Sequence, residues 1–118
     1  MLTLYGIPNC TTVKKARHWL DAHGVNYRFH DFRKDGTDPE QLRTWWEELG
    51  GERLINRRGT TWRTLSVEEK EGLEGNPEVE RAIALLRTYP ALIKRPILDF
   101  GELRHLGFKE DEYRNLFG

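Results

Sequence analysis

The stretch "LTLYGIPNCTTVKKARHWLDAHGVNYRFHDFR", residues 2–33, carries the strongest signals of the fold. Residues 2–7 alternate apolar and polar side chains, which is typical of a β-strand. Residues 11–23 carry apolar side chains at helical spacing, and Gly24 follows in the usual position after a helix. Residues 25–33 alternate again and predict a second strand. Because a strand–helix–strand crossover normally joins parallel strands, we expect a right-handed β-α-β unit.

The remaining residues predict a helical segment and then a β-β-α unit. The first helix of this segment shows clear signals, because Asp38 is a good cap, Pro39 suits the first helical position, and Gly50 stops the apolar face. The other expected elements are a loop over 57–64, a short helix over 66–73, a helix from Asn76 to before Pro90, a hairpin over 94–108 with strands 97–100 and 103–106, and a C-terminal helix. We therefore expect one α/β domain over residues 1–118, with a helical insertion at about 37–89 between its two halves.

Composition limits the classes of function. The chain has 19 Lys and Arg residues and 19 Asp and Glu residues, so direct nucleic-acid binding is not expected. No apolar run approaches the length of a membrane helix, and the N-terminus does not resemble a signal peptide. The four histidines show no paired ligand spacing, so no metal site is expected. We expect a cytoplasmic monomer that neither binds a membrane nor holds a tightly bound cofactor.

Cys10 is the single cysteine, and it lies between the first strand and the first helix. A lone cysteine is often a small buried apolar residue, and this interpretation competes with that of a reactive thiol. The second is favoured because Cys10 is placed at the positive end of the helix dipole, where the amides of Thr12 and Val13 can stabilise a thiolate. Lys14 and Lys15 add positive charge one turn further on. Since Val13 occupies the place of a second cysteine in a Cys-x-x-Cys motif, an external thiol has to complete any redox cycle.

Arginines and a proline far from Cys10 in the sequence are further candidates. Arg57, Arg58 and Arg95 are either solvated surface charges or clamps for an anion, a task that suits the planar guanidinium. Pro96 begins an apolar strand, where it cannot donate a ladder hydrogen bond. From the residues alone a trans peptide bond before Pro96 is favoured, because cis bonds are rare.

Four segments in order resemble one known family. They are "YGIPNCTTVKKA" (5–16), "INRRGTTWR" (55–63), "YPALIKRPIL" (89–98) and "LGFKEDEY" (106–113). Together they resemble the arsenate reductase-like (ArsC) family over nearly the whole chain, and within it the small bacterial YffB-type branch. The resemblance implies a thioredoxin-like fold with a helical insertion between the β-α-β and β-β-α halves.

The resemblance also implies roles for particular residues. Cys10 matches the nucleophile and Arg95 an anion-binding arginine, which makes these two the candidate catalytic residues. Another anion-binding arginine falls at Arg57 or Arg58, and the peptide bond before Pro96 is expected to be cis. The candidate substrate-binding residues are Asn9, Thr11, Thr12, Lys14, Arg57, Arg58 and Pro96.

Three functions follow from these expectations. The first is a glutathione-dependent thiol reductase with Cys10 as its nucleophile, glutathione as co-substrate and glutaredoxin as a further partner. The second is a redox-linked interaction module of the Spx type, which binds a protein partner such as RNA polymerase. The third is a true arsenate reductase, although the third arginine of those enzymes has no clean counterpart here, because Arg104 lies in a different register.

Overall fold

A computed structural model describes residues 2–118, and the chain forms two compact units. The first unit consists of the chain up to Asp35 together with Arg95–Gly118, and the second of Gly36–Lys94. The second unit includes the insertion expected at about 37–89. The expectation of one domain over the whole chain stays a prediction. Among the described residues, no helix combines the length and the apolar character that crossing a membrane requires.

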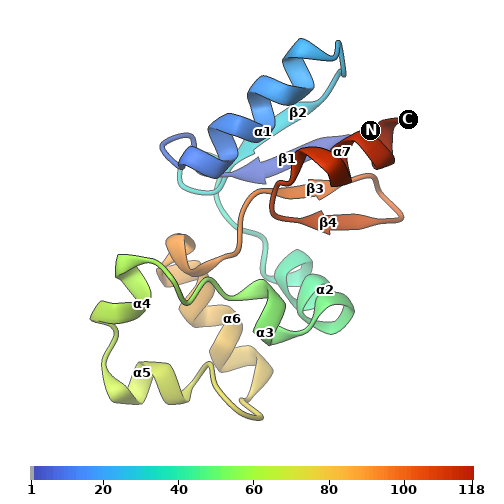
Figure 1. The fold of residues 1–118 in the computed structure, drawn as a ribbon. Coiled ribbons are helices and arrows are strands. Elements are labelled where there is room, and N and C mark those ends of the chain that lie inside the picture. Colours follow the sequence, from blue (N-terminus) through green and yellow to red (C-terminus); the bar gives the residue numbers. More distant parts are fainter. Residues whose placement is uncertain (1) are drawn as a thin grey trace. The chain divides into compact units, whose positions relative to one another are not determined.

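The first unit is a four-stranded sheet with two helices (Figure 1). Its elements are β1 (Thr3–Gly6), α1 (Thr11–Ala22), β2 (Arg28–Asp31), β3 (Ile97–Asp99), β4 (Arg104–Leu106) and α7 (Glu110–Phe117). The strand order is β2-β1-β3-β4. β1 pairs in parallel with β2, as the crossover predicts, and antiparallel with β3, which pairs antiparallel with β4. This is the predicted thioredoxin-like arrangement.

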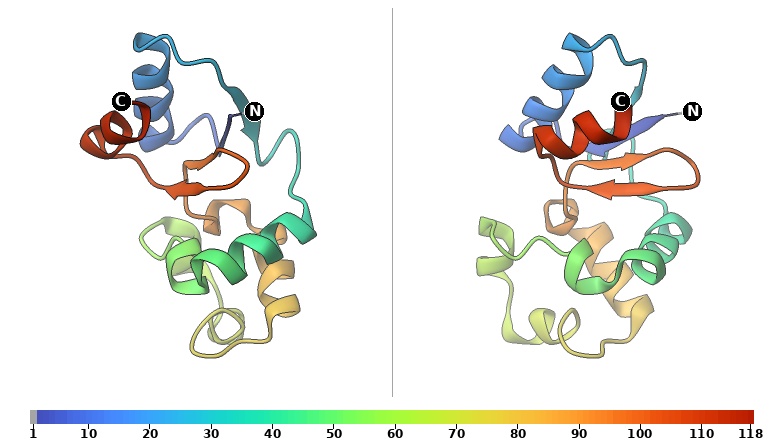
Figure 2. Two further views of the ribbon diagram at one scale, coloured as in Figure 1. Left: turned by 90° about the vertical axis from the view of Figure 1, so that its right-hand side faces the viewer. Right: turned by 45° about the vertical axis from the view of Figure 1, so that its right-hand side comes forward.

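The core of the first unit lies between the sheet and its two helices. α1 and α7 cover the same face of the sheet (Figure 2). Leu4 of β1, Leu98 of β3 and Tyr113 of α7 are fully buried there. Trp19 of α1 packs with them and is almost fully buried. The rings of Trp19 and Tyr113 meet edge to face with centroids 5.6 Å apart. An aromatic pair of this geometry stabilises the contact between the helices beyond the effect of area alone.

Gly6, the last residue of β1, brings α1 close to the sheet. A Cβ atom at this position would lie 2.8 Å from Cγ2 of Val13 on α1. Since non-bonded carbon atoms do not approach so closely, only glycine fits here without displacement. The strand end and the first turn of α1 are thereby held together, and this junction contains Cys10.

The second unit is helical. Its elements are α2 (Pro39–Leu49), α3 (Gly51–Leu54), α4 (Thr60–Thr64), α5 (Val67–Glu71), α6 (Val79–Thr88) and a 3-10 turn over Pro90–Leu92. α2 packs against α6, and Trp45 of α2 and Leu86 of α6 are fully buried. Asp38 caps α2 as predicted, and Ser66 with Glu69 forms the predicted capping box of α5.

Several element boundaries differ from the sequence-based expectation. The expected loop over 57–64 contains α4, and α3 follows Gly50 directly. Helices of four or five residues are too short to show a helical period, so tertiary contacts decide them. The strand expected over 25–33 is confined to Arg28–Asp31, because the amide of Val25 donates instead to the carbonyl oxygen of Leu20 at 3.0 Å.

Three further elements are shorter in the structure than the sequence predicts. The helix expected from Asn76 begins at Val79, and the expected hairpin strands are each one residue shorter in the structure. The hairpin turn lies where it was predicted, because Gly101 adopts a positive φ of 94° and its amide donates to Oδ1 of Asp99 at 2.7 Å.

Candidate functional site

Cys10 lies at the junction between β1 and α1. It is the N-cap residue of α1, with φ −103° and ψ 128°, and it is half-buried. Its amide donates to the carbonyl oxygen of Ile7 at 3.2 Å, and its carbonyl oxygen accepts from the amide of Lys14 at 2.9 Å. These two bonds close the turn and start the helix. The backbone therefore fixes the position of the thiol at the positive end of α1.

The surroundings of Cys10 favour the thiolate. The neutral side chain makes no capping hydrogen bond with the described residues. Burial is the largest single influence and raises the pKa of the Cys10 thiol. The amide of Val13, the charge of Arg95, the amide of Thr12 and a hydrogen bond from Arg95 stabilise the thiolate, and together they lower that pKa below its ordinary value. These contacts therefore favour the thiolate form of Cys10, and its role as a nucleophile stays a prediction.

Arg95 is the charged side chain that lowers the pKa of Cys10, although the two residues are far apart in the sequence. It is half-buried and lies two residues before the start of β3. The peptide bond between Arg95 and Pro96 is cis, so this expectation is confirmed. Pro96 is buried, and its carbonyl oxygen accepts from the amide of Gly107 at 2.8 Å. The segment before β3 is therefore attached to the end of β4.

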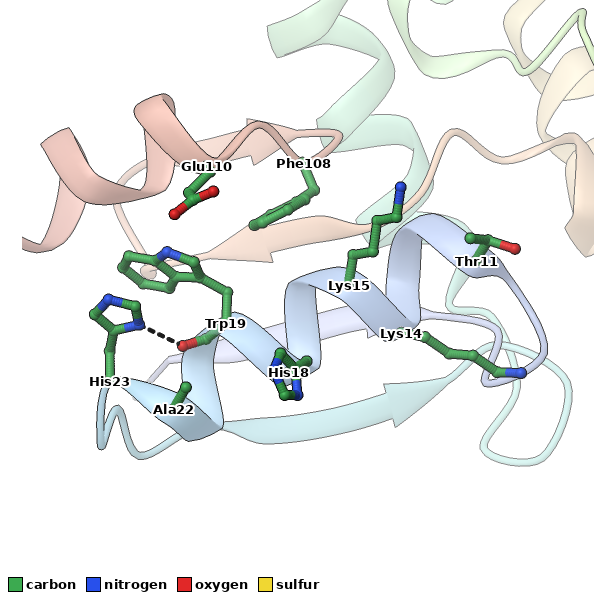
Figure 3. A pocket seen from close by; sticks show the side chains of 9 residues that line it. All are labelled: Thr11, Lys14, Lys15, His18, Trp19, Ala22, His23, Phe108 and Glu110. Carbon is green, nitrogen blue, oxygen red and sulfur yellow. Dashed lines mark hydrogen bonds between the residues drawn. The ribbon is translucent and has the colours of Figure 1, made fainter.

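The residues that flank Cys10 differ in exposure. Asn9 and Thr11 are exposed, whereas Thr12 is half-buried and contributes its amide to the thiolate. Lys14 is exposed, and its side chain extends away from Phe108 (Figure 3). Substrate binding by these four residues and by Pro96 stays a prediction.

Arg57 and Arg58 belong to the second unit. The guanidinium of Arg57 lies 5.3 Å from the ring centroid of Trp62 and donates to the carbonyl oxygen of Glu52 at 3.3 Å. Arg58 is exposed, and its amide donates to Oδ1 of Asn56 at 3.2 Å. The Arg57 side chain is thus restrained by its neighbours while that of Arg58 extends into solvent. A role of either arginine toward Cys10 stays a prediction.

Two residues that shape these sites were not singled out in the sequence. Gly6 permits the close approach of β1 and α1, and a glycine inside an apolar strand pattern is the signal that could have identified it. Trp62 lies under Arg57, and a tryptophan within an arginine-rich segment is a comparable signal for a cation–π contact.

The thioredoxin-like fold with a cysteine at the start of its first helix defines the class of protein, and comparisons with known proteins identify the family. A sequence model of the ArsC family matches residues 5–116. The solved structure of a protein described as YffB is 42% identical, covers 100% of both chains and superposes with a TM-score of 0.89. The chain belongs to the ArsC family.

Two curated relatives illustrate the range of this family. An uncharacterized protein of Haemophilus influenzae is 41% identical over 117 residues, which cover 99% of each chain. The global transcriptional regulator Spx of Streptococcus mutans is 31% identical over 116 residues, which cover 97% of this chain and 81% of the relative. The relatives of this chain therefore include a transcriptional regulator.

Proposed function

We propose that this protein is a glutathione-dependent thiol reductase that uses Cys10 as its nucleophile. The observation that carries the proposal is the lowered pKa of the Cys10 thiol, to which the amides of α1 and the guanidinium of Arg95 contribute. A thiolate at neutral pH attacks disulfide bonds, whereas a protonated thiol does not. The half-buried position of Cys10 leaves part of the residue open to solvent.

The proposed cycle has two exchange steps. First, the Cys10 thiolate attacks a mixed disulfide between glutathione and the substrate, bonds to the glutathione sulfur and releases the substrate as a thiolate. Second, the thiolate of another glutathione attacks the Cys10–glutathione disulfide, which releases oxidised glutathione and restores the Cys10 thiolate. The substrate gains two electrons and the two glutathione moieties leave as one disulfide. An external thiol has to resolve the disulfide because Cys10 is the single cysteine of these 118 residues, and in this proposal that thiol is glutathione.

The neighbours of Cys10 have separate tasks in this cycle. Arg95 stabilises the thiolate both before attack and when it leaves. Asn9, Thr11, Thr12, Lys14 and Pro96, with Arg57 or Arg58, bind the anionic substrate or the carboxylates of glutathione. Glutaredoxin is the proposed partner that accepts glutathione from Cys10 in place of a second glutathione molecule.

Mass spectrometry of the intact protein tests this proposal. After mixing with oxidised glutathione we expect one added glutathione on Cys10, which reduced glutathione then removes. The Cys10→Ser variant is the control and is expected to remain unmodified. A wild-type protein without the adduct, or a Cys10 thiol that titrates at or above the pKa of a free thiol, would contradict the proposal.

A second candidate is an interaction module of the Spx type. The observation in its favour is the similarity to Spx along 97% of this chain. Val13 replaces the second cysteine of a Cys-x-x-Cys switch, so sensing would proceed by glutathionylation of Cys10 rather than by an internal disulfide. Binding to purified RNA polymerase, measured with reduced and with glutathionylated protein, distinguishes this candidate from the reductase. Equal failure to bind in both states would remove it.

A further inference from the structure

A groove in the first unit begins at Thr11, the residue after Cys10 in the sequence, and follows α1. Its volume is about 560 Å³, within the size range of ligand pockets. Residues at intervals of four along α1 form one side, and the segment that leads into α7 forms the other (Figure 3). We call this hollow the α1 groove, and its main lining residues are Thr11, Lys15, Trp19, His23, Phe108 and Glu110.

The floor of the α1 groove is aromatic and rigid. Trp19 is only 6% exposed, and the ring of His23 stacks on it with centroids 3.8 Å apart. His23 is itself held, because its Nδ1 lies 2.8 Å from the carbonyl oxygen of Trp19. Phe108 contacts the ring of Tyr113 edge to face at 4.7 Å. Aromatic side chains fixed in this way offer an apolar surface to a bound side chain at little entropic cost.

The floor also contains an unused hydrogen-bond donor. Nε1 of Trp19 is buried and has no hydrogen-bond partner among residues 2–118. Figure 3 shows this nitrogen on the side of the ring that faces Phe108 and Glu110. The carboxylate of Glu110 is engaged elsewhere, because Oε1 accepts from Nη2 of Arg114 at 2.8 Å. A buried N–H group without a partner is unfavourable, so an acceptor on a ligand would stabilise it.

The charge of the α1 groove favours an acidic ligand. Lys14 and Lys15 are both lining residues, with the Lys15 side chain pointing to the Phe108 side (Figure 3), and the first turn of α1 contains no acidic residue. The positive end of the α1 dipole adds to their charge. Glu110 is the one acidic residue among those that line the groove, and its ion pair with Arg114 offsets its charge.

From these observations we infer that the α1 groove binds an acidic, apolar-containing peptide segment of the protein whose disulfide Cys10 attacks. This inference rests on the proposed function and names its substrate class as a glutathionylated protein rather than a small disulfide. When the glutathionylated cysteine of the substrate protein lies beside Cys10, the substrate chain continues past Thr11 into the groove. A backbone carbonyl or a carboxylate then accepts from Nε1 of Trp19, an apolar side chain covers Trp19 and Phe108, and acidic side chains face the lysines.

Binding can be measured without the chemistry of Cys10. The probe is a short synthetic peptide with aspartates on both sides of a leucine and serine in place of the reactive cysteine. It is titrated into ¹⁵N-labelled protein that carries Cys10→Ser. We expect the indole N–H signal of Trp19, assigned with a Trp19→Phe variant, to shift on saturation. The same peptide with lysines in place of the aspartates is expected to leave it unmoved.

Two pairs of matched variants locate the peptide. Lys15→Glu is expected to weaken binding about five- to tenfold, since it replaces an attraction by a repulsion. Lys34→Glu makes the same change of charge on an exposed residue of the first unit and is expected to have no effect. Ala22→Glu places an acid in the groove about 18 Å along the helix from Cys10, beyond the screening length, and is expected to weaken binding severalfold. Its control is Asn115→Glu on the exposed side of α7.

The outcomes separate the groove from the reductase. The proposal of peptide binding in the α1 groove would be overturned if the groove variants and their controls bound the peptide equally, or if the Trp19 signal did not move. This holds even if Cys10 forms its adduct with oxidised glutathione. Conversely, a peptide that binds as expected to a protein whose Cys10 forms no adduct would support the groove and reject the reductase.

Discussion

The first amides of helices α1 and α2 have no partners within the helix, and the two N-cap residues treat them differently. At α2, Oδ1 of Asp38 accepts from the amide of Glu40 at 3.0 Å. At α1, the N-cap residue is Cys10, whose neutral side chain makes no capping bond with the described residues. An oxygen cap stabilises the helix by satisfying its first amides. Because the neutral thiol of Cys10 does not cap the helix, the amides of Thr12 and Val13 are available to donate to its thiolate form. The start of α1 therefore lacks the side-chain cap that α2 has, and its free amides stabilise a thiolate.

The largest expected effect comes from giving α1 the cap of α2. Cys10→Asp is expected to abolish the glutathione adduct, because no sulfur is left. Compared with Cys10→Ala, it is expected to raise the free energy of unfolding by about 1 kcal/mol through the restored cap. Urea denaturation measures this difference and intact mass measures the adduct. If the Asp and Ala variants are equally stable, the amides of α1 are not available for a cap.

The converse change removes the cap of α2. Asp38→Ala is expected to lower the free energy of unfolding by about 0.5–2 kcal/mol while the adduct on Cys10 forms as in the wild type. Asp38→Asn serves as the control, since an asparagine oxygen still accepts from the amide of Glu40. Should Asn prove as destabilising as Ala in urea denaturation, the hydrogen bond at 3.0 Å is not the source of the effect.

The start of α1 differs from that of α2 in a further way, because the charge of Arg95 lowers the pKa of its N-cap residue, Cys10. In Arg95→Gln the pH profile of Cys10 alkylation is expected to move to higher pH, and the rate at pH 7 to fall severalfold. The amides of Thr12 and Val13 remain, so part of the pKa lowering should persist. Arg95→Lys keeps the charge and is expected to shift the profile less. An unchanged profile in Arg95→Gln would mean that the helix end alone stabilises the thiolate.

The smallest expected effect is a dependence of stability on pH that belongs to α1. The pKa of the Cys10 thiol is lowered in the folded chain, so stability rises with pH between that pKa and the pKa of a free thiol, about 8.5. Below this window the thiol is protonated in both states and contributes nothing, and above it the contribution is complete. We expect the difference in unfolding free energy between wild type and Cys10→Ser to increase across the window. A difference that is flat or that decreases with pH would contradict the lowered pKa.

The predictable parts of the fold are those with strong local signals. The β-α-β unit follows from alternation in residues 2–7 and from the apolar spacing of α1, and α2 follows from Asp38 and Pro39. The helices α3 and α4 were missed because segments of four and five residues contain too little periodicity. The predicted second strand is longer than β2 because the alternating pattern already begins at Val25. In the structure the amide of Val25 belongs to the turn after α1, where it donates to the carbonyl oxygen of Leu20.

At the candidate site, the position of Cys10 at the helix start can be predicted from local sequence signals. The charged side chain that lies beside its thiol cannot. The lysines at positions 14 and 15 were the nearest candidates, whereas Arg95 supplies the charge that lowers the pKa of the thiol. The sequence suggested Arg95 only through a family resemblance. No local pattern links two residues that meet because β3 pairs with β1.

The position of the thiol on its helix can be predicted from the sequence, because the end of a strand, a turn and the start of a periodic helix are local features that span a few residues. The side chains around that thiol and the groove that follows it become known from the folded chain alone. Contacts between distant segments depend on strand pairing and helix packing, as between α1 and α7, and these require the whole first unit to be assembled.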